Sequence, residues 1–298
     1  MRRVLVLGVL LTGLALAAAG CGGDDDDVAG GTTSSTTAAV SCDKDSLDTV
    51  TPGKLTIGTD NPSFPPWFIG VKADSPWDPT TPPTKKGYEA AVAYEVAGQL
   101  GFSDADVEWI VVPFTQLFKP GEKNYDFDIN QASYKPVRAK ALDFSDSYYD
   151  VEQAVVSAKG SKIANAKTLA ELKDAKLGAQ LGTTSYDTIL DVIDPTSEPS
   201  VYDTNNDAIS ALKAKQIDGI VVDYPTSIYM AFVQVPGGTI VGRLPRQSSS
   251  KEYFGLVTEK GSSLMPCLNE AIATLREDGT LEELEQKWIV GSAPPVLQ

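Results

Sequence analysis

Histidine is absent from all 298 residues of the chain. This absence excludes Ser-His-Asp and Cys-His catalysis, and it excludes metal sites built on imidazole. Positive charge is also scarce, because 25 lysines and arginines stand against 40 aspartates and glutamates and give a formal net charge of −15. No cluster of basic residues offsets this charge, so binding to nucleic acid is not expected.

The N-terminal residues have the pattern of a secretion signal. Arg2 and Arg3 are followed by an uncharged stretch over residues 4–19, which is shorter than the roughly 20 apolar residues of a membrane-spanning helix. The stretch ends in Ala18-Ala19-Gly20-Cys21, which resembles a bacterial lipobox, where the cysteine thiol carries a diacylglycerol after cleavage. We therefore expect a signal peptide over residues 1–20 and lipidation of Cys21, with an ordinary cleaved signal as the alternative.

Residues 21–41 are dominated by Asp, Gly, Thr, Ser and Ala. Such a composition buries too little apolar surface to offset chain entropy, so it predicts a flexible low-complexity tether. A lipid on Cys21 would then hold a soluble body at the outer face of the bacterial cell membrane. The predicted localisation is extracytoplasmic and lipid-anchored, and the membrane is contacted through the lipid alone.

Cysteine is scarce, and Cys42 and Cys267 alone remain if Cys21 is lipidated. In an oxidising compartment two cysteines form at most one intramolecular bridge. We expect a Cys42–Cys267 disulfide, and two buried free thiols are the alternative.

Alternating strand patterns and helical patterns indicate an α/β fold. Strands are predicted at residues 54–59, 107–112, 127–132, 154–157, 177–181 and 219–222, and helices at 87–101, 136–138, 169–173, 207–215, 263–275 and 281–288. Strands separated by helices imply βαβ units and α/β layers. No nucleotide-binding glycine pattern is present, and Gln131 stands where a calcium loop requires glycine, so neither cofactor nor metal is expected.

Two segments have residues suited to binding an anionic group. Arg138 follows a predicted strand and turn, with Ser133 before it, and its guanidinium can grip a carboxylate through two parallel hydrogen bonds. The segment Gly182-Thr183-Thr184-Ser185 follows a strand and opens a helix, so its N–H groups and hydroxyls suit the other side of the same group. A surface arginine and an ordinary helix cap are the alternative interpretations.

Other candidates lie near predicted strand ends. Asp223 closes the apolar strand 219–222, at the end where open α/β sheets bind ligands, and its carboxylate suits an ammonium group. Phe64, Phe114 and Trp67 supply aromatic surface near strand ends, with core packing as the alternative for each.

Taken in order, these segments resemble the family 3 extracellular solute-binding proteins of ABC-type amino acid importers, which include glutamine-binding and histidine-binding periplasmic proteins. The resemblance covers residues 54–288. It rests on Gly58-Thr59-Asp60, Phe64-Pro65-Pro66, Gly87-Tyr88-Glu89, Tyr125-Asp126-Phe127-Asp128, Ser133 with Pro136 and Arg138, Asp143-Phe144-Ser145, Tyr148-Tyr149, Gly182-Thr183-Thr184, Asp223, Asp278-Gly279-Thr280 and Lys287-Trp288.

The resemblance implies a two-lobe periplasmic-binding-protein fold of type II with two hinge crossings, placed near Val151 and Lys251. Lobe 1 then comprises residues 42–151 and 251–298, and lobe 2 comprises residues 152–250. The loop 71–86 is longer than is usual in the family and is expected to reshape the mouth of the cleft.

The resemblance also implies roles for individual residues in the cleft. The α-carboxylate of an amino acid is assigned to Arg138, Ser133, Thr183 and Thr184, and the α-ammonium is assigned to Asp223. Phe64 would cover the ligand side chain, Phe114 would face it, Asp60 would touch its polar end, and Gln131 would narrow the pocket or add an amide.

The sequence therefore predicts a monomeric extracytoplasmic substrate-binding lipoprotein. It would capture a free L-amino acid, with a glutamine-like polar side chain preferred and a basic one as the second choice, and deliver it to an ABC transporter permease. An enzyme is not expected. A cleft enzyme of the cyclohexadienyl dehydratase type and a ligand-binding sensor domain are the alternatives, and the paired charges of Arg138 and Asp223 speak against the enzyme.

Overall fold

The computed structural model describes residues 41–70, 77, 83–246, 252–289 and 294–298. The expected signal peptide 1–20, Cys21, the tether up to residue 40 and the crossing near Lys251 lie outside the described residues. Within the described part of the chain, no helix has the length and apolar character needed to cross a membrane.

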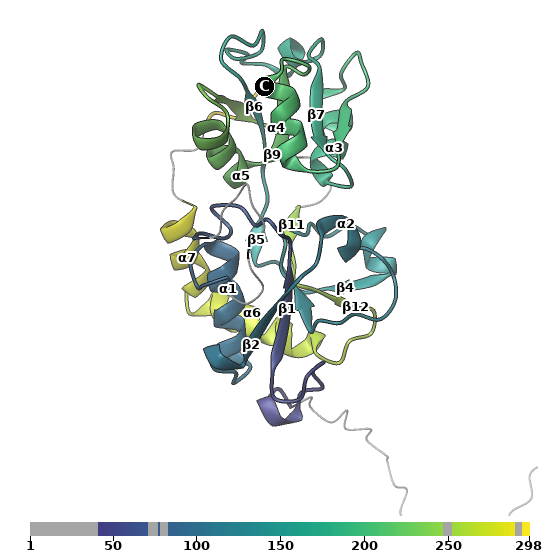
Figure 1. Cartoon of the computed structure of the whole chain (residues 1–298), viewed down its shortest axis with the longest axis vertical. Helices are drawn as coiled ribbons and strands as arrows, with labels where there is room; N and C mark the ends of the chain where they lie inside the picture. The colour runs from purple at the N-terminus through teal and green to yellow at the C-terminus, as the bar shows by residue number, and fades with distance from the viewer. Residues whose placement is uncertain (1–40, 71–76, 78–82, 247–251, 290–293) are drawn as a thin grey trace, which may run out of the picture. The chain divides into compact units, whose positions relative to one another are not determined.

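The first of two five-stranded sheets is built from both ends of the folded chain. Its strand order is β2-β1-β3-β12-β4 (Figure 1). The strands are β1 (Leu55–Thr59), β2 (Val107–Val111), β3 (Phe127–Asp128), β4 (Leu142–Phe144) and β12 (Val257–Glu259). β1 pairs in parallel with β2 and β3, whereas β12 is antiparallel to β3 and β4. Every residue of β1 is buried, as expected for a central strand covered on both faces.

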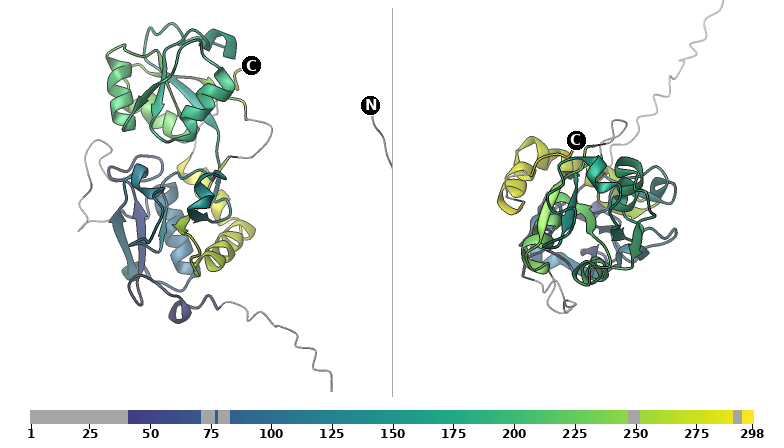
Figure 2. Two further views of the ribbon diagram at one scale, coloured as in Figure 1. Left: turned by 90° about the vertical axis from the view of Figure 1, so that its right-hand side faces the viewer. Right: turned by 90° about the horizontal axis from the view of Figure 1, so that it is seen from above.

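Three helices pack against one another beside the first sheet (Figures 1 and 2). They are α1 (Tyr88–Gln99), α6 (Met265–Glu277) and α7 (Thr280–Trp288), and a short helix, α2 (Phe114–Leu117), follows β2. Val92 and Val96 of α1 are fully buried, as their helical spacing predicts. Gly87 precedes α1 with φ 106°, and a Cβ there would lie 2.3 Å from the Trp67 carbonyl oxygen, so only glycine fits.

The second sheet has the order β10-β6-β9-β7-β8. Its strands are β6 (Gln153–Ser157), β7 (Leu177–Gln180), β8 (Ser200–Tyr202), β9 (Gly219–Asp223) and β10 (Thr239–Arg243). The helices that follow its strands are α3 (Thr184–Thr188), α4 (Asn205–Lys213) and α5 (Tyr224–Tyr229). β7 is parallel to β8 and β9, whereas β6 is antiparallel to β9 and β10.

Shorter segments complete the described chain. Turns of 3₁₀ helix cover Lys44–Ser46, Asp104–Asp106, Arg138–Lys140 and Leu169–Leu172, and π-helical turns cover Ile189–Ile193 and Met230–Gln234. The two-stranded pair of β5 (Tyr149–Asp150) and β11 (Tyr253–Phe254) places the two hinge segments side by side, and Val151 donates to the Glu252 carbonyl at 2.9 Å. The architecture is the two-lobe α/β fold that the resemblance implies, and the predicted lobe boundaries stay a prediction.

The last described residues pack on the second sheet, although the predicted boundaries assign all of residues 251–298 to lobe 1. Leu297 donates its N–H to the Arg243 carbonyl at 2.8 Å, and the Arg243 N–H donates to the Pro295 carbonyl at 3.0 Å. Leu297 is 2% exposed and belongs to the hydrophobic cluster of this sheet. The C-terminal end accordingly lies along β10, where Val296 forms a parallel bridge with Arg243.

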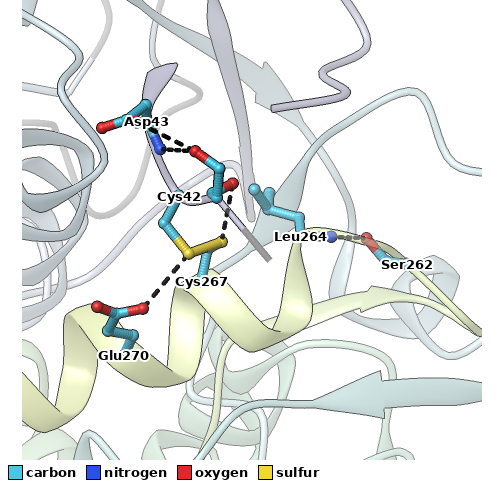
Figure 3. The surroundings of a disulfide bond; sticks show 7 residues. Cys42, Asp43, Ser262, Leu264, Cys267 and Glu270 are labelled. Atoms are coloured by element: carbon cyan, nitrogen blue, oxygen red, sulfur yellow. Dashed lines mark hydrogen bonds between the residues drawn. A yellow bond between two sulfur atoms is a disulfide. The ribbon is translucent and has the colours of Figure 1, made fainter. Parts of the chain in front are cut away.

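The predicted disulfide is confirmed. Cys42 and Cys267 are bonded with a Cα–Cα separation of 5.4 Å, although 225 positions separate them in sequence (Figure 3). Cys267 is buried on α6, so the bridge ties the segment before β1 to that helix.

Three predicted elements differ from their patterns in length, position or type. The strand predicted at 127–132 ends at Asp128, because the chain turns at Gln131, whose φ is 47°. The helix predicted at 136–138 is a 3₁₀ turn over Arg138–Lys140, and the one at 169–173 is a 3₁₀ turn over Leu169–Leu172. Both helical turns are too short for cooperative α-helix formation.

Candidate functional site

A single cavity brings together all nine ligand-binding residues predicted from the sequence. These residues are Asp60, Phe64, Phe114, Gln131, Ser133, Arg138, Thr183, Thr184 and Asp223. The remaining lining residues are Thr59, Pro62, Ser63, Phe68, Asn130, Gln180, Asn205 and Thr226. Many of these lining residues lie at or just after the carboxyl ends of β1, β3, β7 and β9, so both sheets contribute to the cavity.

Arg138 is a half-buried cation held by backbone oxygens and aromatic rings. Its guanidinium donates to the Ser133 carbonyl at 2.5 Å and to the Gly182 carbonyl at 2.7 Å. The guanidinium carbon lies 3.9 Å from the centre of the Phe118 ring and 6.0 Å from that of Phe114. Burial lowers the pKa of Arg138 to about 10, so the side chain keeps its charge at neutral pH.

Hydroxyl groups from the two sheets meet next to Arg138. Ser133 follows β3, and its Oγ lies 3.3 Å from the Thr184 Oγ1 at the start of α3. Thr183 donates its hydroxyl to the Gln180 carbonyl at 2.8 Å. Ser133, Thr183 and Thr184 therefore line the same cavity as Arg138.

Asp223 lines the same cavity as Arg138 and carries a group of the opposite charge type. It supplies a carboxylate at the end of β9. Gln153 donates its amide to Asp223 Oδ1 at 2.8 Å. Burial, followed by the nearby carboxylate of Glu252, raises the pKa of Asp223 to about 8. A cationic group placed beside this carboxylate would favour its ionised form.

Two hinge residues that the sequence analysis missed connect these groups. Ser133 donates its hydroxyl to Glu252 Oε1 at 2.8 Å, and the Gln153 amide lies 3.3 Å from the same oxygen. The Ser185 hydroxyl donates to the amide oxygen of Gln153 at 2.8 Å. Neither Gln153 nor Glu252 belongs to a recognisable motif, so only the tertiary structure reveals them.

Gln131 lines the cavity and is held by a buried glutamate. Its N–H donates to Glu89 Oε1 at 2.7 Å, its amide donates to Oε2, and the Tyr148 hydroxyl donates to Oε1. Burial raises the pKa of Glu89 to about 7. The geometry of this corner thus depends on Glu89, which belongs to the motif Gly87-Tyr88-Glu89.

Asp60 is positioned by a residue from the long loop. The buried indole of Trp77 donates to the Asp60 carbonyl at 3.0 Å. The Asn61 side chain donates its amide to the Trp77 carbonyl at 2.9 Å and accepts the Trp77 N–H at 2.6 Å. Burial raises the pKa of Asp60. Within the loop 71–86, residues 71–76 and 78–82 lie outside the described residues, so the expected effect of this loop on the cleft mouth stays a prediction.

The three aromatic candidates separate into two groups. Phe64 and Phe114 line the cavity. Trp67 is fully buried in the core of the first sheet, and its indole donates to the Thr226 hydroxyl at 2.8 Å. For Trp67 the packing interpretation is therefore the right one.

Comparison with known proteins identifies the family. The model of the bacterial extracellular solute-binding proteins, family 3, matches residues 55–291. The L-cystine-binding protein TcyJ of Escherichia coli (strain K12) is 29% identical over 206 residues, which cover 68% of this chain and 73% of that protein. The glutamine-binding protein GlnH of Bacillus subtilis (strain 168) is 27% identical over 229 residues, which cover 74% and 80%.

A solved structure described as an ancestral arginine-binding protein bound to arginine superimposes with a TM-score of 0.63 and 29% identity, covering 79% of this chain and 98% of that one. The match of the family model spans most of the chain and includes every cavity-lining residue named above. The chain belongs to the bacterial extracellular solute-binding proteins, family 3.

Proposed function

We propose that the protein captures a free L-amino acid outside the cytoplasm and delivers it to the permease of an ABC transporter. The observation that carries this proposal is the presence of Arg138 and Asp223 in the lining of one cavity. A zwitterion removed from water needs a partner for each charge, and this pair supplies one of each sign. The similar proteins described as binding cystine, glutamine and arginine support the same ligand class.

In this proposal the α-carboxylate binds at Arg138, Ser133 and the Thr183-Thr184 turn. The planar guanidinium is suited to two parallel hydrogen bonds, and the hydroxyls add neutral donors. The α-ammonium binds to Asp223, and Phe64 and Phe114 flank the ligand side chain.

The lining also favours a polar side chain. Amide groups of Asn130, Gln131, Gln180 and Asn205 contribute to the cavity together with Asp60. Amides donate and accept hydrogen bonds, so they complement a side-chain amide fully. We therefore propose a glutamine-like ligand first and a basic amino acid second, with Asp60 as the partner for a side-chain cation.

Ligand binding would also favour approach of the two lobes. Arg138 and Phe64 follow strands of the first sheet, whereas Thr184 follows a strand of the second sheet and Asp223 ends one. A ligand that contacts both sets binds the closed arrangement more tightly and shifts the population toward it. A lipid on Cys21 would keep this monomeric body near the permease, which would recognise the closed state.

A thermal-shift screen of residues 42–298 tests the proposal, because a ligand that binds only the folded state raises the unfolding midpoint. The screen covers the twenty amino acids and prephenate. A raised midpoint with L-glutamine or with basic amino acids is expected. No shift with any amino acid would refute the proposal, and turnover of prephenate would indicate an enzyme instead.

A further inference from the structure

Glu252 occupies a position next to the cavity that backbone pairing defines. Its carbonyl accepts the Val151 N–H at 2.9 Å, and the following residue, Tyr253, accepts the Tyr134 N–H through its carbonyl at 3.0 Å. Ser133 forms a β-bridge with Phe254. The hinge segment and the loop after β3 are thus in register, and this register directs the Glu252 side chain toward the Ser133 hydroxyl.

The contact between Glu252 and Ser133 uses the single proton of the serine hydroxyl. Ser133 Oγ donates to Glu252 Oε1 at 2.8 Å and is 3.3 Å from Thr184 Oγ1. A hydroxyl has one proton to donate, so Ser133 cannot donate simultaneously to Glu252 and to a second carboxylate. Ser133 is 2% exposed, which leaves little room for water to replace either partner.

The charges around Glu252 make this competition stronger. Asp223 shares the Gln153 amide with Glu252, because Gln153 Nε2 lies 2.8 Å from Asp223 Oδ1 and 3.3 Å from Glu252 Oε1. The carboxylates of Glu252 and Asp223, like that of Asp187, favour the charged form of Arg138. The carboxylate of Glu252 would therefore repel an incoming carboxylate. It also already accepts the hydrogen bond of Ser133, which the incoming group would need.

We propose that Glu252 is a specificity-determining residue whose carboxylate competes with the α-carboxylate of the ligand for the Ser133 hydroxyl. The inference rests on the proposed function and adds a residue of the protein that lowers its affinity for the ligand. Only a ligand able to displace Glu252, by bonding strongly to Arg138, occupies the site fully. Glu252 thereby keeps the affinity moderate, which favours release to a transporter.

The test compares titration calorimetry of the wild type and Glu252→Gln with four ligands: L-glutamine, L-arginine and the α-carboxamide of each. The glutamine side chain keeps the size of Glu252 and an acceptor for Ser133 but removes the charge. We expect Glu252→Gln to bind the free amino acid at least about fivefold more tightly, and the carboxamide with little change.

Glu152→Gln is the matched control, because Glu152 carries the same charge on the neighbouring hinge segment and pairs with Arg243 instead of Ser133. This control should leave the ratio of amino acid to carboxamide affinity unchanged. Thermal midpoints of both variants without ligand verify that they fold.

Three results overturn the inference: weaker amino acid binding by Glu252→Gln, an equal gain for both ligand types, or an equal effect of Glu152→Gln. If the wild type binds none of the amino acids in the thermal-shift screen, the proposed function itself fails and the inference falls with it. If the wild type binds but Glu252→Gln leaves the affinity ratio unchanged, the inference alone fails.

Discussion

The guanidinium of Arg138 stacks on the ring of Phe118, with 3.9 Å between the guanidinium carbon and the ring centre. The ring covers one face of the cation while its edge remains able to donate hydrogen bonds. Phe118 therefore orients a side chain that would otherwise have many rotamers. Phe118 lies just after α2, which follows β2, whereas Arg138 comes after β3, so this contact joins two different loops of the first sheet.

Arg138→Ala should lower the affinity for every amino acid to a similar extent, by about 100-fold, because the charge-assisted hydrogen bonds to the α-carboxylate are lost. The midpoint of the ligand-free protein should change little. Calorimetric titration with several amino acids measures this. Phe118→Leu, which keeps the arginine but removes the ring, should weaken binding by about three- to tenfold. Retained affinity in Arg138→Ala would rule out the clamp.

Binding should strengthen as the pH rises from 6 to 8. With a pKa of about 8, Asp223 is mostly protonated at pH 6 in the ligand-free protein, and the ammonium needs its ionised form. The affinity therefore rises by up to about tenfold per pH unit and levels off above the pKa. Dissociation constants measured across this range check the prediction. A flat profile from pH 6 to 8 would contradict the assignment of the ammonium to Asp223.

The ligand-free protein should lose stability as the pH rises from about 4 to about 8. Burial raises the pKa values of Glu89 and Asp223 above their unfolded values, so the folded state holds protons that the unfolded state releases. This contribution to stability is fully present below pH 4 and is lost as the pH passes the folded-state pKa values. Denaturant titrations at several pH values measure it, with Glu89→Gln expected to flatten part of the slope.

The Cys42–Cys267 bridge should stabilise the folded protein without changing its affinity for the ligand. It closes a loop of 225 positions, so replacing both cysteines by serine should lower the unfolding free energy by about 3 to 5 kcal/mol. Guanidinium chloride titrations with and without a reductant measure the loss. Amino acid affinity should be unchanged because neither cysteine lines the cavity. An unchanged unfolding midpoint under reducing conditions would show that the bridge contributes nothing.

Leu297 should contribute to the stability of the second sheet through its contact with Gly242. Leu297→Ala should cost about 2 to 4 kcal/mol, since the side chain is 2% exposed. A Cβ at Gly242 would lie 2.7 Å from the Leu297 side chain, so Gly242→Ala should also destabilise the protein. The double variant should be more stable than the sum of the two losses predicts, because alanine at 297 leaves space for the new methyl. Strict additivity would contradict the contact.

The longer secondary-structure elements were predictable from local pattern. Residues 55–59 and 219–223 form strands and residues 87–101 contain α1, because alternation and helical spacing of apolar residues persist over enough positions to define a face. Two- and three-residue strands such as β5 and β11 carry no such periodicity. Their pairing depends on the partner segment, which lies about a hundred residues away in the sequence.

The sequence by itself predicted the family, the α/β class, the disulfide and nine of the residues that line the cavity, since each has a motif or a scarce residue type to mark it. The tertiary structure alone revealed Gln153, Glu252 and Phe118 around those residues. These side chains act through hydrogen bonds and ring contacts to segments distant in sequence, and such contacts exist only after the two sheets and the hinge have formed. Their residue types are common, so no local pattern distinguishes them from ordinary surface positions.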